Sequence, residues 1–191
     1  MLEILIAEDE FLCLTGLIND LEELGHKIIG EAANGIELVE MAENLNPDLI
    51  ITDINMPLLN GIEAIKKINT KKEIPSIVIS GYSDEKLVKN AIELGIYSYI
   101  VKPFEKRDLK IAIDLAIARY EDYKKVKNEL EKTKTDLENR KIIEKAKGLL
   151  MEHKNLTERE AFKKMQKMSK DKNRKLILIA EDIIKAFNIL N

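Results

Sequence analysis

Hydrophobic positions in the first 120 residues follow two alternating patterns. Short runs rich in Ile, Val and Leu have the length of buried strands, and the stretches between them carry apolar residues every three or four positions, as helices do. The runs cover residues 2–7, 27–30, 48–52, 74–79 and 98–101, and the helical stretches cover 10–24, 35–45, 60–69, 84–94 and 105–120. We therefore predict an α/β fold of five βα units, with a doubly wound parallel sheet covered by helices on both faces.

The last of these helices is predicted to continue beyond the sheet, because neither Gly nor Pro occurs between residue 105 and Gly148. Tyr123, Leu130 and Leu137 recur every seven residues, and Val126 and Thr133 occupy the intervening position of the heptad. Such a seam is typical of a parallel coiled coil between two copies of a chain. A solvated helical linker is the alternative, since three heptads with a Thr in the seam are marginal.

Residues 138–191 read as a three-helix bundle. The first helix continues through Leu150, and the second begins at Thr157-Glu158-Arg159-Glu160, an N-terminal capping box. The third carries an apolar stripe from Leu176 to Phe187. The pattern divides the chain into a sheet domain (1–120), a helical coiled-coil linker (121–137) and a bundle (138–191).

Composition narrows the class of protein. The chain has 191 residues, of which 45% are hydrophobic, with one Cys and two His. The single Cys permits no intramolecular disulfide, and with so few His residues a Cys/His zinc site is not expected. No apolar run reaches the roughly 18 residues of a membrane span, and the N-terminus lacks the basic start of a signal peptide. We expect a soluble, cytoplasmic protein with no membrane partner.

Charge is distributed unevenly along the chain. Residues 1–120 carry a net charge of −9 from 12 basic and 21 acidic side chains, whereas residues 138–191 carry +6 from 14 basic and 8 acidic ones. An acidic domain joined to a basic tail favours a polyanionic partner for the tail. A lysine-rich solvated helical surface is the alternative.

Candidate chemistry gathers where the predicted strands end. Glu8 and Asp9 follow the first strand, Asp53 the third, Ser80 the fourth and Lys102 the fifth. Carboxylates that meet at one sheet edge repel one another unless a cation neutralises them, and an all-oxygen donor set suits Mg²⁺. A nearby ammonium and hydroxyl would complete a pocket for a phosphoryl group. Asp53 is the natural nucleophile of this set.

Four motifs in residues 1–120 resemble those of response-regulator receiver domains. They occur in order, each at a predicted strand end: Ala7-Glu8-Asp9-Glu10, Asp53-Ile54-Asn55-Met56-Pro57 with Gly61, Ile79-Ser80-Gly81, and Lys102-Pro103-Phe104. A single motif of this kind is weak evidence, but four in this order, each at a predicted strand end, are typical of the family. Glu8 stands where the family more often has Asp, and Ser80 where it more often has Thr; both keep the required chemistry.

The resemblance implies a two-component phosphoprotein. A sensor histidine kinase would phosphorylate Asp53, with Mg²⁺ bound by Glu8, Asp9, Asp53 and the backbone carbonyl of Asn55. Lys102 would contact the phosphoryl group, and Ser80 and Tyr99 would move together as the switch. On pattern alone, the alternative for Tyr99 is a half-buried strand residue with a solvated hydroxyl, and the alternative for Ser80 is an ordinary turn residue at the end of a strand.

The tail resembles ANTAR domains. The similarity lies in Glu138-Asn139-Arg140, in the run from Ile142 to Met151 that contains Ala146-Lys147-Gly148-Leu149-Leu150-Met151, in Leu156 to Phe162, and in Ser169 to Leu176. This family implies RNA binding that prevents transcription termination, by a dimer that recognises paired hairpins in a leader transcript.

Several tail residues are candidates for RNA contact. Arg140, Lys147, Arg174 and Lys175 could reach phosphates or bases, and solvated surface is the alternative for each. Gly148 costs a helix about 1 kcal/mol relative to Ala, which indicates close approach of a ligand or of another helix.

The favoured function is therefore a phosphorylation-controlled RNA-binding antiterminator that dimerises when phosphorylated. A DNA-binding output is less favoured because residues 156–175 contain no evident recognition helix after a tight turn, and a purely protein-interaction output is a further alternative. The tail lacks a nucleophile with a base or a phosphate-cradling glycine loop, so the chain is expected to be a phosphoacceptor with at most slow autodephosphorylation, and not an enzyme.

Overall fold

A computed structural model describes residues 1–81 and 94–190 of the chain. The helix predicted at 84–94 falls almost entirely outside these residues. The chain divides into two compact units, Met1–Lys124 and Lys125–Asn191. In the described residues, no helix combines the length and the apolarity needed to cross a membrane.

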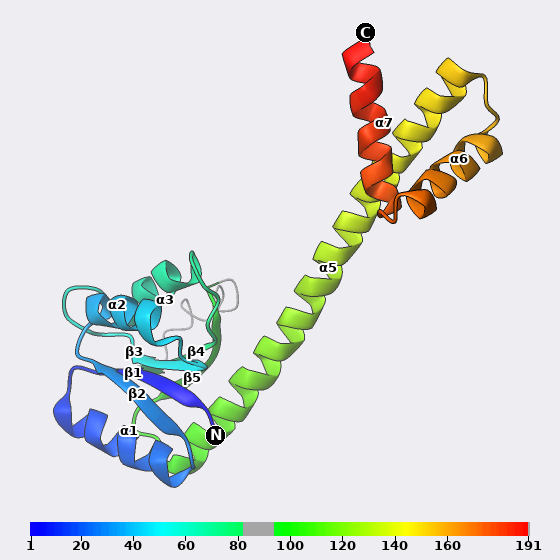
Figure 1. Ribbon diagram of the computed structural model, residues 1–191. Coiled ribbons are helices and arrows are strands. Elements are labelled where there is room, and N and C mark those ends of the chain that lie inside the picture. Colours follow the sequence, from blue (N-terminus) through cyan, green and yellow to red (C-terminus); the bar gives the residue numbers. More distant parts are fainter. Residues whose placement is uncertain (82–93, 191) are drawn as a thin grey trace. The chain divides into compact units, whose positions relative to one another are not determined.

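The first unit contains a five-stranded parallel sheet (Figure 1). Its spatial order is β2-β1-β3-β4-β5, with bounds β1 Glu3–Ala7, β2 Lys27–Ala32, β3 Leu49–Asp53, β4 Ser76–Ser80 and β5 Ile96–Val101. The predicted α/β class and parallel sheet are confirmed. β2 is two residues longer than predicted because pairing with β1 continues through Glu31 and Ala32. Glu31 is charged and Ala32 is small, so neither continues the apolar run that predicted the strand.

Helices cover both faces of this sheet, as predicted. α1 (Phe11–Glu23) and the first turns of α5 (Lys106–Lys154) pack on one face, where Leu17, Leu21, Leu109 and Ile113 join the core. α2 (Gly35–Leu45) and α3 (Gly61–Asn69) pack on the other face through residues such as Leu38, Ala42, Ala64 and Ile68. The order of strands reverses between β1 and β3, and in such sheets the groups that do chemistry gather beyond the carboxyl ends of the strands.

α5 is a single helix of 49 residues, so the predicted continuation beyond the sheet is confirmed. Its last turns pack in the second unit against α6 (Glu158–Asp171) and α7 (Leu176–Leu190), which completes the predicted three helices. The core of this unit consists of Ala146, Leu150, Ala161, Met165, Ile179, Ala180 and Ile183. The capping box is present: the side chain of Thr157 accepts from the backbone of Glu160, whose carboxylate accepts from the backbone of Thr157.

Candidate functional site

The carboxyl edge of the sheet brings together polar side chains from three strands. β1 and β3 are almost wholly buried runs, so Glu8 and Asp53 are placed where apolar strands give way to the edge. Both are buried, with side chains 2% and 9% exposed, respectively. Lys102 reaches the same point from the residue after β5.

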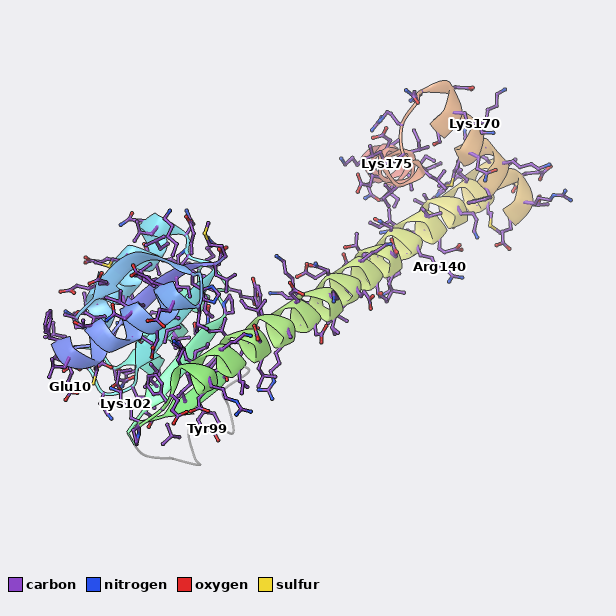
Figure 2. The ribbon with its side chains drawn as sticks, turned by 90° about the horizontal axis from the view of Figure 1, so that it is seen from below. Glu10, Tyr99, Lys102, Arg140, Lys170 and Lys175 are labelled. Atoms are coloured by element: carbon purple, nitrogen blue, oxygen red, sulfur yellow. The ribbon has the colours of Figure 1, made fainter. Side chains whose placement is uncertain are left out.

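Lys102 joins the two buried carboxylates. Its Nζ lies 2.5 Å from Asp53 Oδ2 and 2.7 Å from Glu8 Oε2, and its side chain is 23% exposed. Glu8 and Asp53, which precede Lys102 by 94 and 49 positions in the sequence, therefore share one ammonium. Figure 2 labels Lys102 at this end of the sheet, with Glu10 close by.

This arrangement alters the acid–base properties of the site. Burial raises the pKa of the Glu8 carboxyl above its ordinary value, and Lys102 only partly offsets that effect. Burial also disfavours the charged form of Lys102, but its hydrogen bonds to Asp53 and Glu8 outweigh burial and raise the pKa of the ammonium. Lys102 is therefore a permanent cation, and Glu8 is a carboxylate that depends on a nearby positive charge.

The backbone around Asp53 is fixed by close packing. The amide of Asn55 donates to Asp53 Oδ1 at 2.9 Å, and the hydroxyl of Thr52 donates to the carbonyl of Asp53 at the same distance. Gly61 begins α3 directly against this turn, where an added Cβ would lie 2.0 Å from the carbonyl oxygen of Asp53. Only glycine fits there, which explains its place in the motif.

The oxygen donors suit a hard divalent cation, although their ligand atoms do not all lie close to one another. Glu8, the exposed Asp9 and Asp53 offer oxygen ligands, which Mg²⁺ prefers. Among the described residues, these three carboxylates do not form a group with all ligand atoms within 4.8 Å of one another; Glu8, Glu10 and Cys13 do. Glu10 and Cys13 lie at the start of α1, two and five residues after Glu8, and neither was predicted from the sequence to bind a metal.

The two predicted switch residues lie on neighbouring strands. Ser80 ends β4 and is buried, whereas Tyr99 in β5 is 53% exposed. Tyr99 lines a groove of about 430 Å³ between β5 and α5, together with residues that include Ile111, Leu115 and Arg119. This exposure of about one half agrees with the half-buried strand residue that the sequence offered as an alternative for Tyr99.

In the second unit the predicted RNA-contact residues have different surroundings. Arg140 and Lys175 are exposed on α5 and just before α7 (Figure 2). Arg174 is ion-paired with Asp182 at 2.6 Å. Lys147 has a side chain only 10% exposed, and its ammonium lies 2.7 Å from carboxylate oxygens of both Glu144 and Glu158.

Gly148 is exposed, and apart from its chain neighbours and the backbone of its own helix no described atom would lie within 4 Å of a Cβ built on it. The sequence suggested that either another helix or a ligand approaches Gly148 closely. Among the described residues, no other helix of the chain does so.

The predicted seam residues lie along α5. Val126, Leu130 and Leu137 are 66%, 52% and 55% exposed, and the hydroxyl of Thr133 donates to the backbone of Glu129. Tyr123 instead packs on Tyr97 of β5, so among the described residues the exposed apolar stripe of α5 runs from Val126 to Leu137.

Two family models match the chain. The response regulator receiver domain matches residues 4–114, and the ANTAR domain matches residues 131–184. A transcriptional regulatory protein from Mycobacterium tuberculosis, PdtaR, is 40% identical over 181 residues, which cover 95% of this chain and 88% of that protein.

Solved structures resemble the first unit. The signal receiver domain of a modulated diguanylate cyclase from Desulfovibrio desulfuricans is 30% identical, with a TM-score of 0.57, over 62% of this chain and 95% of that one. The receiver domain of the sensor histidine kinase PA1611 from Pseudomonas aeruginosa is 28% identical, with a TM-score of 0.54, over 60% of this chain and 97% of that one. The latter structure holds a magnesium ion in its active-site cleft.

Proposed function

The chain belongs to the response regulators that combine a receiver domain with an ANTAR domain, and from this premise we propose that it is a phosphorylation-controlled RNA-binding antiterminator. In this proposal a sensor histidine kinase in the cytoplasm phosphorylates Asp53, the phosphorylated chain dimerises, and the ANTAR domains bind paired hairpins of a leader RNA. The observation that carries the proposal is the shared ammonium of Lys102 between Asp53 and Glu8, in a chain whose tail matches the ANTAR model.

The receiver residues act by positioning and by charge. Asp53 Oδ attacks the phosphorus of a phosphohistidine, and the imidazole leaves as the new acyl phosphate forms. Lys102 is already in contact with Asp53, so its ammonium can pair with a phosphoryl oxygen without a large movement. The amide of Asn55 keeps the carboxylate oriented through Oδ1.

Glu8, Asp9, Asp53 and the carbonyl of Asn55 would hold Mg²⁺, which supplies neutralisation of the charge that develops on the transferring phosphoryl group. The buried Glu8 supports this assignment because its carboxylate depends on nearby positive charge. The chain itself is a phosphoacceptor with at most slow autodephosphorylation.

The signal is the added charge of about −1.5 to −2. It favours a packing in which Ser80 approaches the phosphoryl group and Tyr99 turns inward, and this state has a higher affinity for a second copy. Pairing of Val126, Leu130, Thr133 and Leu137 in a coiled coil then brings two ANTAR domains together. Two linked domains bind two hairpins more tightly because the second contact is intramolecular.

In the tail, Arg140, Gly148 and Lys175 are proposed to contact RNA directly. Arg174 and Lys147 are bound to carboxylates of the same unit, so Lys147 is assigned a positioning role and Arg174 can contribute only by exchanging Asp182 for a phosphate. The three-part division at residues 1–120, 121–137 and 138–191 forms part of the proposal.

One experiment tests the proposal as a whole. Sedimentation of the full chain is measured with Mg²⁺, with and without beryllofluoride, and then with a pool of two-hairpin RNAs that have randomised loops. We expect a dimer only with beryllofluoride, and recovery of specific RNAs by that dimer. Equal affinity for hairpin RNA and for duplex DNA at matched salt would contradict RNA recognition and favour a DNA-binding output. Activity of the tail without any RNA binding would favour a protein-interaction output.

A further inference from the structure

The outer surface of α6 carries positive charge in a regular pattern. Arg159, Lys163, Lys167 and Lys170 are spaced by four, four and three residues, so they share one side of the helix, and all four are exposed. We refer to them as the α6 basic stripe. They lie opposite the buried residues Ala161 and Met165, which face the core of the unit.

No carboxylate neutralises the α6 basic stripe in the part of the chain that the structure describes. Among the described residues, none of its four cations forms an ion pair, whereas Lys147 pairs with two glutamates and Arg174 with an aspartate of the same unit. Four like charges along about 16 Å of helix repel one another and are stabilised by an external polyanion.

Two of the three acidic residues of α6 are engaged by groups outside the stripe; the third, Asp171, ends the helix and forms no ion pair with the stripe in the described residues. The carboxylate of Glu158 pairs with Lys147 of α5, and the carboxylate of Glu160 accepts from both the backbone and the hydroxyl of Thr157. Both contacts lower the pKa of their carboxyl groups, so both acids stay charged and engaged at the N-terminal turn. The same contacts fix the start of α6 and hence the direction in which the stripe faces.

We propose that the α6 basic stripe is the surface that docks the sugar-phosphate backbone of the RNA. This inference rests on the proposed RNA-binding function and adds to it the face that meets the ligand, which lies on a different helix from Arg140 and Gly148. Lysines spaced along a helix contact phosphates and carry no base identity, so the stripe supplies affinity and orientation while residues elsewhere select the loops. Figure 2 shows Lys170 near the end of α6, in the same unit as Lys175.

The test compares two charge-matched variants of the full chain. Lys163→Gln with Lys167→Gln removes two cations of the stripe, and Lys132→Gln with Lys185→Gln removes two exposed lysines from α5 and α7. The probe is one RNA recovered by the wild-type chain from the two-hairpin pool, measured with beryllofluoride over a range of salt concentrations.

We expect the stripe variant to bind about tenfold more weakly at 0.15 M salt, and its plot of log affinity against log salt to be shallower by about 1.4 to 1.8. The control variant should keep the wild-type slope. An unchanged slope in the stripe variant would overturn the inference and assign the stripe to an acidic protein surface. Failure of the wild-type chain to recover any RNA would instead refute the proposed function, so the two failures are distinguishable.

Discussion

The rings of Tyr97 in β5 and Tyr123 in α5 pack edge to face, with centroids 6.1 Å apart. Tyr120 makes a second edge contact with Tyr97 at 5.5 Å, and its hydroxyl donates to the carbonyl of Glu73 at 3.1 Å. Arg119 donates to the carbonyl of Tyr97 at 3.0 Å. Three residues within five positions therefore attach the outgoing helix to the strand that also carries Tyr99, so a change in β5 has a direct physical route into α5.

This packing gives Tyr97 a distinctive titration. The pKa of the Tyr97 phenol is raised to about 12, mainly by burial and further by the neighbouring Tyr123 and Glu73. The unfolded chain loses this proton near pH 10 while the folded chain keeps it, so the free energy of unfolding falls by about 2 kcal/mol between pH 10 and pH 12. Absorbance at 295 nm and urea unfolding at several alkaline pH values measure both effects. Tyr97→Phe should remove the late absorbance step and flatten this part of the stability curve; an identical curve would contradict the assignment.

Asp53→Asn should abolish labelling by a small phosphodonor such as acetyl phosphate in the presence of Mg²⁺, because the amide cannot form an acyl phosphate. Asp48→Asn is the matched control, since Asp48 lies immediately before the same strand and its replacement leaves the edge with Lys102 intact. Intact-mass measurement should show one phosphate on the wild type and on the control, and none on the variant. Stoichiometric label on Asp53→Asn would refute the phosphoacceptor assignment.

Leu130→Ala with Leu137→Ala should weaken the beryllofluoride-induced dimer at least about 100-fold, because four leucines leave the seam of each dimer. Glu131→Ala with Glu138→Ala changes neighbouring exposed positions and should sediment as the wild type does. Tyr123→Ala tests the link between β5 and α5: because Tyr123 packs on Tyr97, this change should alter the dependence of dimerisation on beryllofluoride more than the dimer itself. A dimer that survives loss of both leucines would place the interface elsewhere.

Lys147→Met should lower both the melting temperature of the C-terminal unit and its affinity for RNA, because it leaves Glu144 and Glu158 close together without their shared cation. Lys145→Met removes the same charge two residues earlier, at an exposed position. If Lys147 acts by positioning α6, only its variant should melt earlier in circular dichroism, and the loss of affinity should track the loss of structure at each temperature. Equal melting of both variants with weaker RNA binding by Lys147→Met alone would indicate direct contact instead.

Motifs with local causes could be predicted from the sequence. Apolar runs and helical periodicity gave the order of strands and helices, the absence of Gly and Pro gave the unbroken α5, and Thr157 with Glu160 gave the start of α6. The position of Asp53 and Lys102 at the carboxyl ends of two parallel strands, the third and the fifth, was enough to expect them at one edge. The extra residues of β2 were missed because pairing with β1, and not their own hydrophobicity, makes them a strand.

The sequence alone determined the fold class, the place of the four receiver motifs and the basic character of the tail, since each depends on local pattern or on total charge. Only the tertiary structure decided which charges are free. Lys147 and the lysines of the α6 basic stripe look alike in the sequence. In the described residues, Lys147 is bound between two carboxylates, whereas the stripe lysines are exposed and form no ion pair. Tyr123 likewise fits a heptad but packs on Tyr97. The physical reason is that ion pairs and ring contacts depend on distances between helices and strands, which no spacing along one helix contains.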